Sequence, residues 1–483
     1  MSKSSITDYA AIRNVMAAFS PAPKIEPNAQ VPPDRVFTPY SHRAVLDPGR
    51  QLVVGNRGMG KSLWTHALTN PEVRKRAASV YGQPSLNKTD VVIGFNGSDK
   101  LSAIAPTREA IKRALSSGYN EDDIWRGVIF RAICFVNGEA EEKDIESTLV
   151  KIETSPGLWE NKISEVDDEF ARRGKSILIL FDALDRLADD WQSIRLLTTS
   201  LMKRALGLRS FHSFRTKIFI RPDQYSDQRL FEFSDGSKLK NSHVDLSWQP
   251  HELFGLLLFE ICRDDKANTV LKNLANKIGA SAALMFSEQR SRPTFEEQNA
   301  LINAIAGTYM GSDKRRGRVY TWVPLHLSDA KETCSPRTFL TAWQKAAGHE
   351  PAPKDRAVDH LGLIEGVRSA SSARLEELRE DYRWIDDALE ALKGQFVPIE
   401  RETLLDVWKN SQIVQRILRE SKKGKWLAPV ELDTRADPAA LLEAMKSIAV
   451  MEERANGKIN VPDIFRVEAG IKRKGGVAVP RRN

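Results

Sequence analysis

The chain has 483 residues, of which 41% are hydrophobic and 28% charged, as expected for a soluble globular protein of two to four domains. No window approaches about 18 unbroken apolar residues, and the only cysteines (Cys134, Cys262 and Cys334) lack zinc spacing, so we expect a reduced, cytoplasmic protein with no membrane partner and no disulfide framework. The net charge is +8, and residues 411–483 carry 15 basic against 9 acidic residues, so +6 of this charge lies where an anionic partner is expected.

The first 48 residues contain a short helical pattern followed by the proline-rich stretch 20–35. The prolines predict an extended N-terminal arm over residues 1–48 rather than packed elements. This end also has polar and acidic breaks and no cleavage pattern, so we do not interpret it as a signal peptide.

A phosphate-binding pattern, G-x-x-x-x-G-K-[ST], follows the apolar residues 51–54 and precedes a helical stripe at residues 63–68. In this strand–loop–helix context, glycines let backbone N–H groups turn toward phosphate oxygens, and the helix N-terminus adds partial positive charge. We therefore predict an ATP site rather than an ordinary glycine turn, with Lys61 on the β- and γ-phosphates and Ser62 on Mg²⁺. The predicted binding residues are Gly55, Asn56, Arg57, Gly58, Met59, Gly60, Lys61 and Ser62.

An apolar run at residues 176–181 ends in Asp182 and predicts a buried parallel strand with an acid at its carboxyl edge. Parallel sheets bind ligands outside that edge, so Asp182 is predicted to hold Mg²⁺ unless it is only a strand-ending acid. Asp185 is predicted to orient or activate the attacking water, with capping of the next helix as the alternative.

A further apolar run, 216–225, presents Arg221 before a proline. Arg221 is predicted to sense or stabilise a γ-phosphate, and the alternative is a salt bridge to Asp223 or to another surface acid. Residues 90–97 and 243–248 are two more expected strands, and amphipathic segments lie between the strands, so we expect an α/β parallel sheet with crossover helices over residues 49–249. The expected helices cover residues 122–138, 159–173 and 189–206.

Residues 250–348 have a mostly helical pattern and predict a helical lid. Within it, the segment 312–320 carries four basic residues in an expected loop, which either contacts nucleic acid or is simply solvated. A proline-rich linker and a long charged helix at 371–394 are expected within residues 349–395.

The last predicted domain, 396–483, contains a helix, a strand, Asn456-Gly457 and another strand, the order of a winged-helix ending with its hairpin. Basic residues follow the hairpin and predict a DNA or RNA contact, whereas the alternative is a protein partner or packing against the chain's own ATPase core. These cations are Lys472, Arg473, Lys474, Arg481 and Arg482.

The phosphate-binding loop, the box 182–186 (D-A-L-D-R) and the strand end Ile220-Arg221-Pro222 together resemble the signal-transduction ATPases with numerous domains (STAND), whose NACHT-type members carry D-G-L-D-E and S-R-P. Origin-recognition and helicase-loader ATPases of the AAA+ group are similar, but they carry an acid where this chain has Ala183, which favours the STAND side. The resemblance is closest to bacterial P-loop ATPases with a C-terminal winged helix, some of which are found with anti-phage defence genes.

The dipeptide Pro336-Arg337 resembles the sensor-2 element of the lid in these ATPases. The resemblance implies that Arg337 reaches the nucleotide, and the alternative is an ordinary helix start with a solvated arginine. The resemblance also implies an ATP-driven switch that hydrolyses ATP and regulates a partner effector.

Two other functions remain open at this point, a DNA-bound loader that forms homo-oligomers and a nucleotide-stabilised scaffold with negligible turnover. Asn87-Lys88-Thr89-Asp90 matches a GTPase base-reading box, but it comes before a strand and too early in the chain, so we expect ATP rather than GTP.

Overall fold

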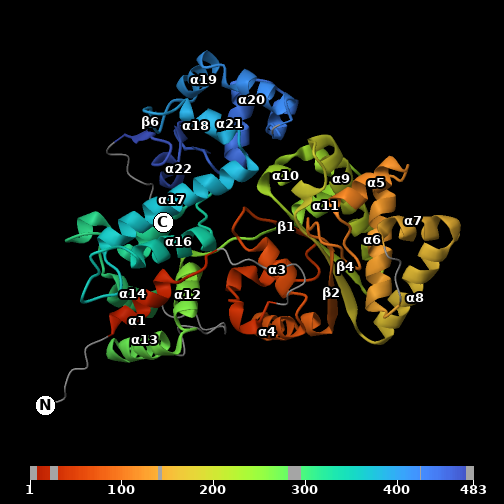
Figure 1. The fold of residues 1–483 in the computed structure, drawn as a ribbon, viewed down its shortest axis with the longest axis horizontal. Coiled ribbons are helices and arrows are strands. Elements are labelled where there is room, and N and C mark those ends of the chain that lie inside the picture. The colour runs from red at the N-terminus through yellow and green to blue at the C-terminus, as the bar shows by residue number, and fades with distance from the viewer. Residues whose placement is uncertain (1–7, 22–30, 140–143, 281–294, 425, 475–483) are drawn as a thin grey trace. The chain divides into compact units, whose positions relative to one another are not determined.

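The computed structural model describes residues 8–21, 31–139, 144–280, 295–424 and 426–474 (Figure 1). The chain divides into two compact units, one formed by residues 24–246 and the other by residues 1–23 together with residues 247–483. In the described residues, no helix combines the length and the apolar character that crossing a lipid bilayer requires.

The unit formed by residues 24–246 is built on a five-stranded parallel sheet with the order β2-β3-β4-β1-β5. All five predicted strands are present, and the fold is the predicted α/β P-loop NTPase fold. The apolar runs form strands because a parallel sheet covered on both faces buries nearly every side chain, as the five buried residues Ile177–Phe181 show. The strands are β1 (Leu52–Val54), β2 (Thr89–Phe95), β3 (Ser176–Phe181), β4 (Phe214–Ile220) and β5 (Val244–Asp245).

Helices connect these strands, and the three predicted helices are present. The polar residues before them fix their starts, since Asn120 forms a capping box with Asp123, and Asp190 accepts a hydrogen bond from Ser193 N (2.8 Å). The helices are α2 (Arg43–Leu46), α3 (Lys61–Ala67), α4 (Pro71–Tyr81), α5 (Arg108–Ser116), α6 (Glu121–Val136), α7 (Ile145–Thr154), α8 (Leu158–Arg172), α9 (Trp191–Gly207), α10 (Pro222–Ser226) and α11 (Gly236–Asn241).

The core of this unit lies between the sheet and α6. Trp125 of α6 is fully buried between Phe95 and Phe181, with ring centroids 6.5 and 5.6 Å away in edge-to-face contacts. Its indole nitrogen donates to the carbonyl oxygen of Leu197 in α9 (2.8 Å), so one side chain joins two strands and two helices.

The second unit begins with α1 (Tyr9–Ala17), and here the prediction of an unpacked arm over residues 1–48 is wrong. Ile12 and Met16 are fully buried, and Arg13 donates to the carbonyl oxygens of Ala357 (3.0 Å) and Pro353 (2.8 Å), far along the chain. The short helical pattern is amphipathic, and its apolar face is covered by helices that the local sequence does not contain. The proline-rich residues 22–30 lie outside the described residues.

The predicted lid region is helical and has its own aromatic core. Phe254 stacks on Tyr320 with 4.4 Å between ring centroids and meets Phe339 edge to face at 5.1 Å. The helices are α12 (Pro250–Ile261), α13 (Asp265–Lys277), α14 (Phe295–Ala306), α15 (Val319–Leu327) and α16 (Pro336–Ala347).

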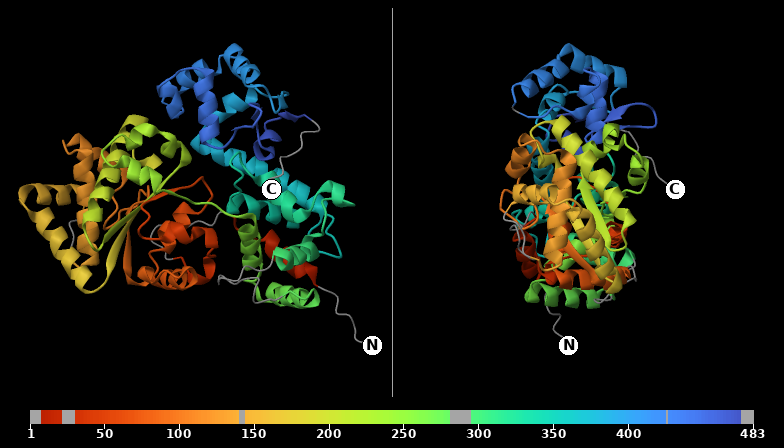
Figure 2. Two further views of the ribbon diagram at one scale, coloured as in Figure 1. Left: turned by 180° about the vertical axis from the view of Figure 1, so that it is seen from behind. Right: turned by 90° about the vertical axis from the view of Figure 1, so that its right-hand side faces the viewer.

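The predicted long helix 371–394 begins earlier and is interrupted. α17 spans His360–Asp381 and α18 spans Ile385–Glu390, with Tyr382 in a non-helical conformation between them. The charged residues of 371–394 gave no indication that the helix begins at residue 360. The first half of α17 carries the small residues Gly362 and Gly366, and there α17 lies beside α16 (Figures 1 and 2).

These two glycines set how closely α16 and α17 approach. A Cβ atom at Gly366 would overlap the carbonyl oxygen of Ala342, and one at Gly362 would lie 2.8 Å from that of Ala346. We expect Gly366→Ala to destabilise this unit by about 2 kcal/mol despite the better helix propensity of alanine, because two backbones must separate. In the matched control, Gly348→Ala, the added Cβ meets nothing closer than 3.6 Å, so its urea midpoint should match that of the wild type. Equal midpoints for both variants would contradict the packing argument.

The C-terminal region has the predicted winged-helix ending. The strands β7 (Glu452–Glu453) and β8 (Ile459–Asn460) pair antiparallel around Gly457, whose φ is +75°, as predicted for the Asn-Gly hairpin. Its core continues from Leu375 to Ile471 and therefore includes the end of α17, which the predicted boundary at residue 396 separates from this domain. The other elements are β6 (Phe396–Val397), α19 (Arg401–Asn410), α20 (Ile413–Lys422), α21 (Pro438–Ser447), α22 (Asp463–Arg466) and β9 (Lys472–Arg473), which pairs parallel with β6.

Candidate nucleotide site

The phosphate-binding loop, residues 55–60, leaves the carboxyl end of β1 and enters α3 at Lys61. Gly58 (φ +81°) and Gly60 (φ +108°) have left-handed backbone conformations, which explains glycine at these two positions. The Lys61 ammonium donates to the carbonyl oxygens of Gly55 (2.5 Å) and Asn56 (3.1 Å), so it folds back over the start of its own loop.

The structure brings Ser62 and Asp182 together at the carboxyl edge of the sheet. The Ser62 hydroxyl donates to Asp182 Oδ2 (2.8 Å), and Asp182 is only 3% exposed at the end of β3. The Asp182 backbone N–H donates to Phe95 O (2.9 Å), which fixes the carboxylate beside the loop. A hydroxyl and a carboxylate oxygen are ligands that Mg²⁺ prefers, so this pair fits the predicted metal site.

Arg221, at the end of β4, lies between two acids. Its guanidinium contacts Asp185 Oδ2 (3.3 Å) and Asp223 Oδ2 (3.2 Å), so the predicted alternative, a salt bridge to Asp223, is present together with the contact to Asp185. The Arg221 backbone N–H donates to Gln224 Oε1 (3.1 Å). Asp223 Oδ1 and Gln224 Nε2 are buried without a hydrogen-bond partner among the described residues, and such orphaned atoms mark a place where a ligand or water is expected.

Asp185 does not cap the helix that follows. It lies in a short 3-10 turn, Leu184–Arg186, and Asp190 is the residue that caps α9. Asp185 is therefore available for the polar cluster around Arg221. Asp223 and Gln224 were not among the predicted site residues, although Gln224 stands at the third helical position after Arg221, where a reciprocal cap is common.

Arg337 lies in the other unit, at the second position of α16, whose cap is Ser335. Its guanidinium contacts Glu377 Oε1 (3.1 Å) of α17, and the same carboxylate binds Arg374, whose side chain is 5% exposed. The structure thus gives Arg337 a carboxylate partner within its own unit, and its contact with nucleotide remains a prediction.

The GTPase-like box lies at the wrong edge of the sheet for base recognition. Thr89 and Asp90 are the first residues of β2 and pair with Ser176 and Ile177 at the start of β3. The phosphate-binding loop follows the carboxyl end of a strand in the same parallel sheet, at the opposite edge. This segment therefore lies away from the phosphate-binding loop, as expected for a chance match to a base-reading box.

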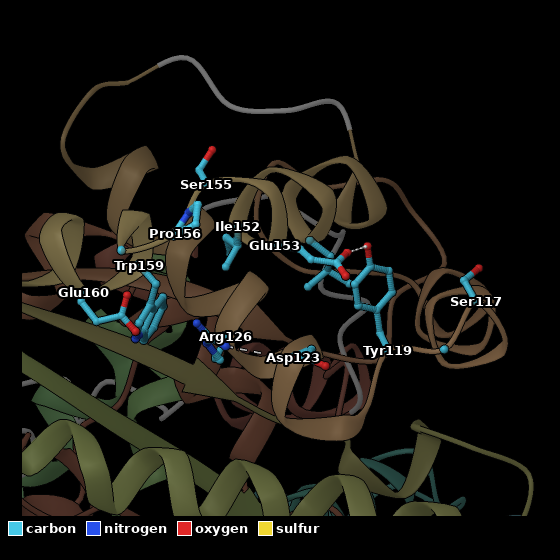
Figure 3. Close-up of a pocket in the computed structure, with 13 residues that line it drawn as sticks. Ser117, Tyr119, Asp123, Arg126, Ile152, Glu153, Ser155, Pro156, Trp159 and Glu160 are labelled. Carbon is cyan, nitrogen blue, oxygen red and sulfur yellow. Dashed lines mark hydrogen bonds and ion pairs between the residues drawn. The ribbon is translucent and has the colours of Figure 1, made fainter.

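One cavity, of about 430 Å³, lies among α5, α6, α7 and α8 and is separate from the phosphate-binding loop (Figure 3). Arg126 lies over the ring of Trp159 (5.6 Å), and Tyr119 donates to Glu153 (3.1 Å). The carboxylates of Asp123, Glu153 and Glu160 outnumber the single guanidinium in the lining, so the cavity disfavours phosphate and is not the nucleotide site.

The parallel sheet, the loop between β1 and α3, and the acid at the end of β3 together define an α/β P-loop NTPase fold, which is followed by a winged-helix domain.

No protein-family model matches the chain, and no curated protein matches it. Among solved structures, the chain is similar to the ORC2 protein of Aeropyrum pernix, described in ADPNP and ADP complexes, with 11% identity, TM-score 0.35, and coverage of 87% of this chain and 85% of that chain. It is also similar to Cdc6p of Pyrobaculum aerophilum, with 10% identity, TM-score 0.30 and coverage of 94% of both chains.

Proposed function

We propose that the protein is an ATP-binding and ATP-hydrolysing molecular switch. The observation that carries this proposal is the 2.8 Å contact between Ser62, at the start of the phosphate-binding helix, and the buried Asp182 on a separate strand. A phosphate loop and an acid brought together from distant parts of the chain are what Mg²⁺-assisted phosphoryl transfer requires.

In this proposal each residue has a distinct task. The backbone N–H groups of residues 55–60 and the Lys61 ammonium bind the triphosphate, and Ser62 and Asp182 hold Mg²⁺. The bound Mg²⁺ supplies charge neutralisation at the phosphate oxygens. Asp185 orients the attacking water, and Arg221 stabilises charge on the γ-phosphate.

The switch depends on Arg221 exchanging partners. The guanidinium contacts Asp185 (3.3 Å) and Asp223 (3.2 Å), and a bound γ-phosphate would compete with these acids for it. A ligand shifts an equilibrium only by contacts that differ between two states, and the exchange of partners by Arg221 is such a difference in contacts. Arg337 of the helical lid is a second proposed contact with the nucleotide.

The biological setting of the switch is also a proposal. The STAND resemblance favours regulation of a protein effector, with anti-phage defence as a setting, and homo-oligomers are compatible with it. A second candidate, a DNA-bound remodelling ATPase, is favoured by a cluster of exposed cations in residues 312–318. ATP hydrolysis that rises several-fold with duplex DNA, and less so at high salt, would favour the second candidate.

Two substitutions test the proposed activity in a phosphate-release assay with parallel ATP-binding measurements. We expect Lys61→Ala to lose ATP binding and hydrolysis together, because the only basic side chain at the end of the loop is removed. We expect Asp185→Ala to retain ATP binding and to lose hydrolysis by on the order of 100-fold, as a water-orienting residue should. A wild-type protein that binds ATP but does not hydrolyse it with any partner would instead establish the scaffold alternative.

A further inference from the structure

The basic loop, defined here as residues 312–318, carries four cations and one acid in seven residues. Lys314, Arg315, Arg316 and Arg318 are all exposed, and none of the ion pairs formed among the described residues involves them. The segment thus has a net charge of +3, and no acidic side chain of the described residues forms an ion pair with its four cations. Such unpaired cations are what an anionic partner would neutralise.

The basic loop has a fixed backbone. Met310 N donates to Gly317 O (2.9 Å) and Val319 N donates to Thr308 O (3.1 Å), which closes the base of the loop like a short hairpin. The one acid, Asp313, accepts from the backbone N–H of Arg315 (2.8 Å), so it shapes the turn and forms no ion pair with a neighbouring cation. The cations are therefore presented from a preorganised turn, which lowers the entropic cost of binding.

Several cations in and after the hairpin of the winged-helix domain, where nucleic-acid binding was one of two predicted alternatives, already have partners. Lys458 contacts Glu400 (2.5 Å), Arg454 contacts Glu452 (3.7 Å) and Arg473 contacts Asp463 (3.3 Å). Lys472 lies over the ring of Phe396 (5.5 Å). Lys474 is exposed, and Arg481 and Arg482 lie outside the described residues.

We infer that the basic loop, rather than the wing hairpin, is the main contact of this protein with the phosphate backbone of duplex DNA. Residues 312–318 include no aromatic residue, and Trp322, whose ring lies beside Gly317, is stacked on His326 (4.0 Å between ring centroids), so the loop offers little for stacking unpaired bases. A charge-dense, rigid and non-stacking surface matches the closely spaced phosphates of a duplex better than a single strand. This inference deepens the second candidate function, and it is tested without ATP so that its outcome is separate from that of the hydrolysis assays.

The test compares two quadruple variants of the full chain that lose the same charge. The loop variant carries Lys314→Gln, Arg315→Gln, Arg316→Gln and Arg318→Gln, and the wing variant carries Arg454→Gln, Lys458→Gln, Lys472→Gln and Arg473→Gln. Binding to a fluorescent duplex is measured by anisotropy between about 50 and 200 mM salt, where each phosphate contact contributes about −0.9 to the slope of log K against log salt.

We expect the loop variant to flatten this slope by about 3 and to weaken binding on the order of 100-fold at the lowest salt, while the wing variant stays within a few-fold of the wild type. A third variant, Arg315→Lys with Arg316→Lys and Arg318→Lys, keeps the charge and should keep the slope. Unchanged melting temperatures exclude unfolding as the cause.

Three outcomes would overturn the inference. The wing variant could lose the salt dependence while the loop variant keeps it. The wild type could fail to bind duplex DNA, which would also remove the second candidate function but leave the ATPase proposal untouched. Finally, the basic loop could be required for binding vesicles of phosphatidylserine and phosphatidylcholine and not for binding DNA, which would assign it to a membrane surface.

Discussion

Asp182→Asn should lower the rate of ATP hydrolysis on the order of 1,000-fold, or about 4 kcal/mol in activation free energy. The substitution keeps the size of the side chain and an oxygen that accepts from the Ser62 hydroxyl, and the backbone bond from Asp182 N to Phe95 O does not involve it. What it removes is the negative charge beside the phosphate-binding loop. Since Asp182 is 3% exposed, water cannot easily replace that charge.

The matched control is Asp90→Asn. Asp90 is the second residue of β2, at the opposite edge of the same sheet, and its partner is Lys175 (3.7 Å), so an equal change of charge occurs away from the loop. Hydrolysis by this variant should equal that of the wild type. A single-turnover assay over a Mg²⁺ titration measures both variants, and wild-type rates for Asp182→Asn would reduce Asp182 to the strand-ending acid that sequence analysis left as its alternative.

The sheet and the phosphate-binding loop could be predicted because their signals are local. The strand Ser176–Phe181 is an uninterrupted apolar run, and the loop is a spacing of glycines and a lysine within eight residues. The order of the strands was not predicted, because the placement of β4 between β1 and β3 depends on its pairing with β1, in which Leu52 and Ile218 are 166 positions apart in the sequence.

The errors have a common physical cause, which is that packing partners are distant in the sequence. α1 seemed part of an arm because the helices that contact it, α12, α13 and α16, lie between residues 250 and 347. In the same way, the alternatives for Arg221 could not be resolved from spacing, since Asp185 and Asp223 approach the guanidinium from two different strand ends. The sequence indicates which residue types are present at an edge, and the fold decides which of them meet.

Lys217, in the middle of β4, should make the stability of the α/β unit rise with pH above neutrality. The side chain is fully buried, and its ammonium donates to the carbonyl oxygens of Asp47 (2.9 Å) and Arg50 (2.6 Å), which ties the segment before β1 to the sheet. Burial lowers the pKa of Lys217 from its ordinary value of 10.5 to about 7, and the Asp47 charge opposes this effect.

Because the folded-state pKa lies below the unfolded one, the unfolded chain binds more protons between about pH 7 and 10.5. The contribution of Lys217 to the free energy of unfolding therefore increases across this window, by up to about 1.4 kcal/mol per pH unit, and is constant below it, where both states are protonated. We expect Lys217→Met to remove this increase. The control is Lys175→Met, directly before β3, which should keep the increase because the Lys175 side chain is 49% exposed. Urea midpoints measured at several values between about pH 7 and 9 test this prediction. Parallel curves for the wild type and Lys217→Met would contradict it, because they would mean that the buried amine stays protonated in the folded state across this range.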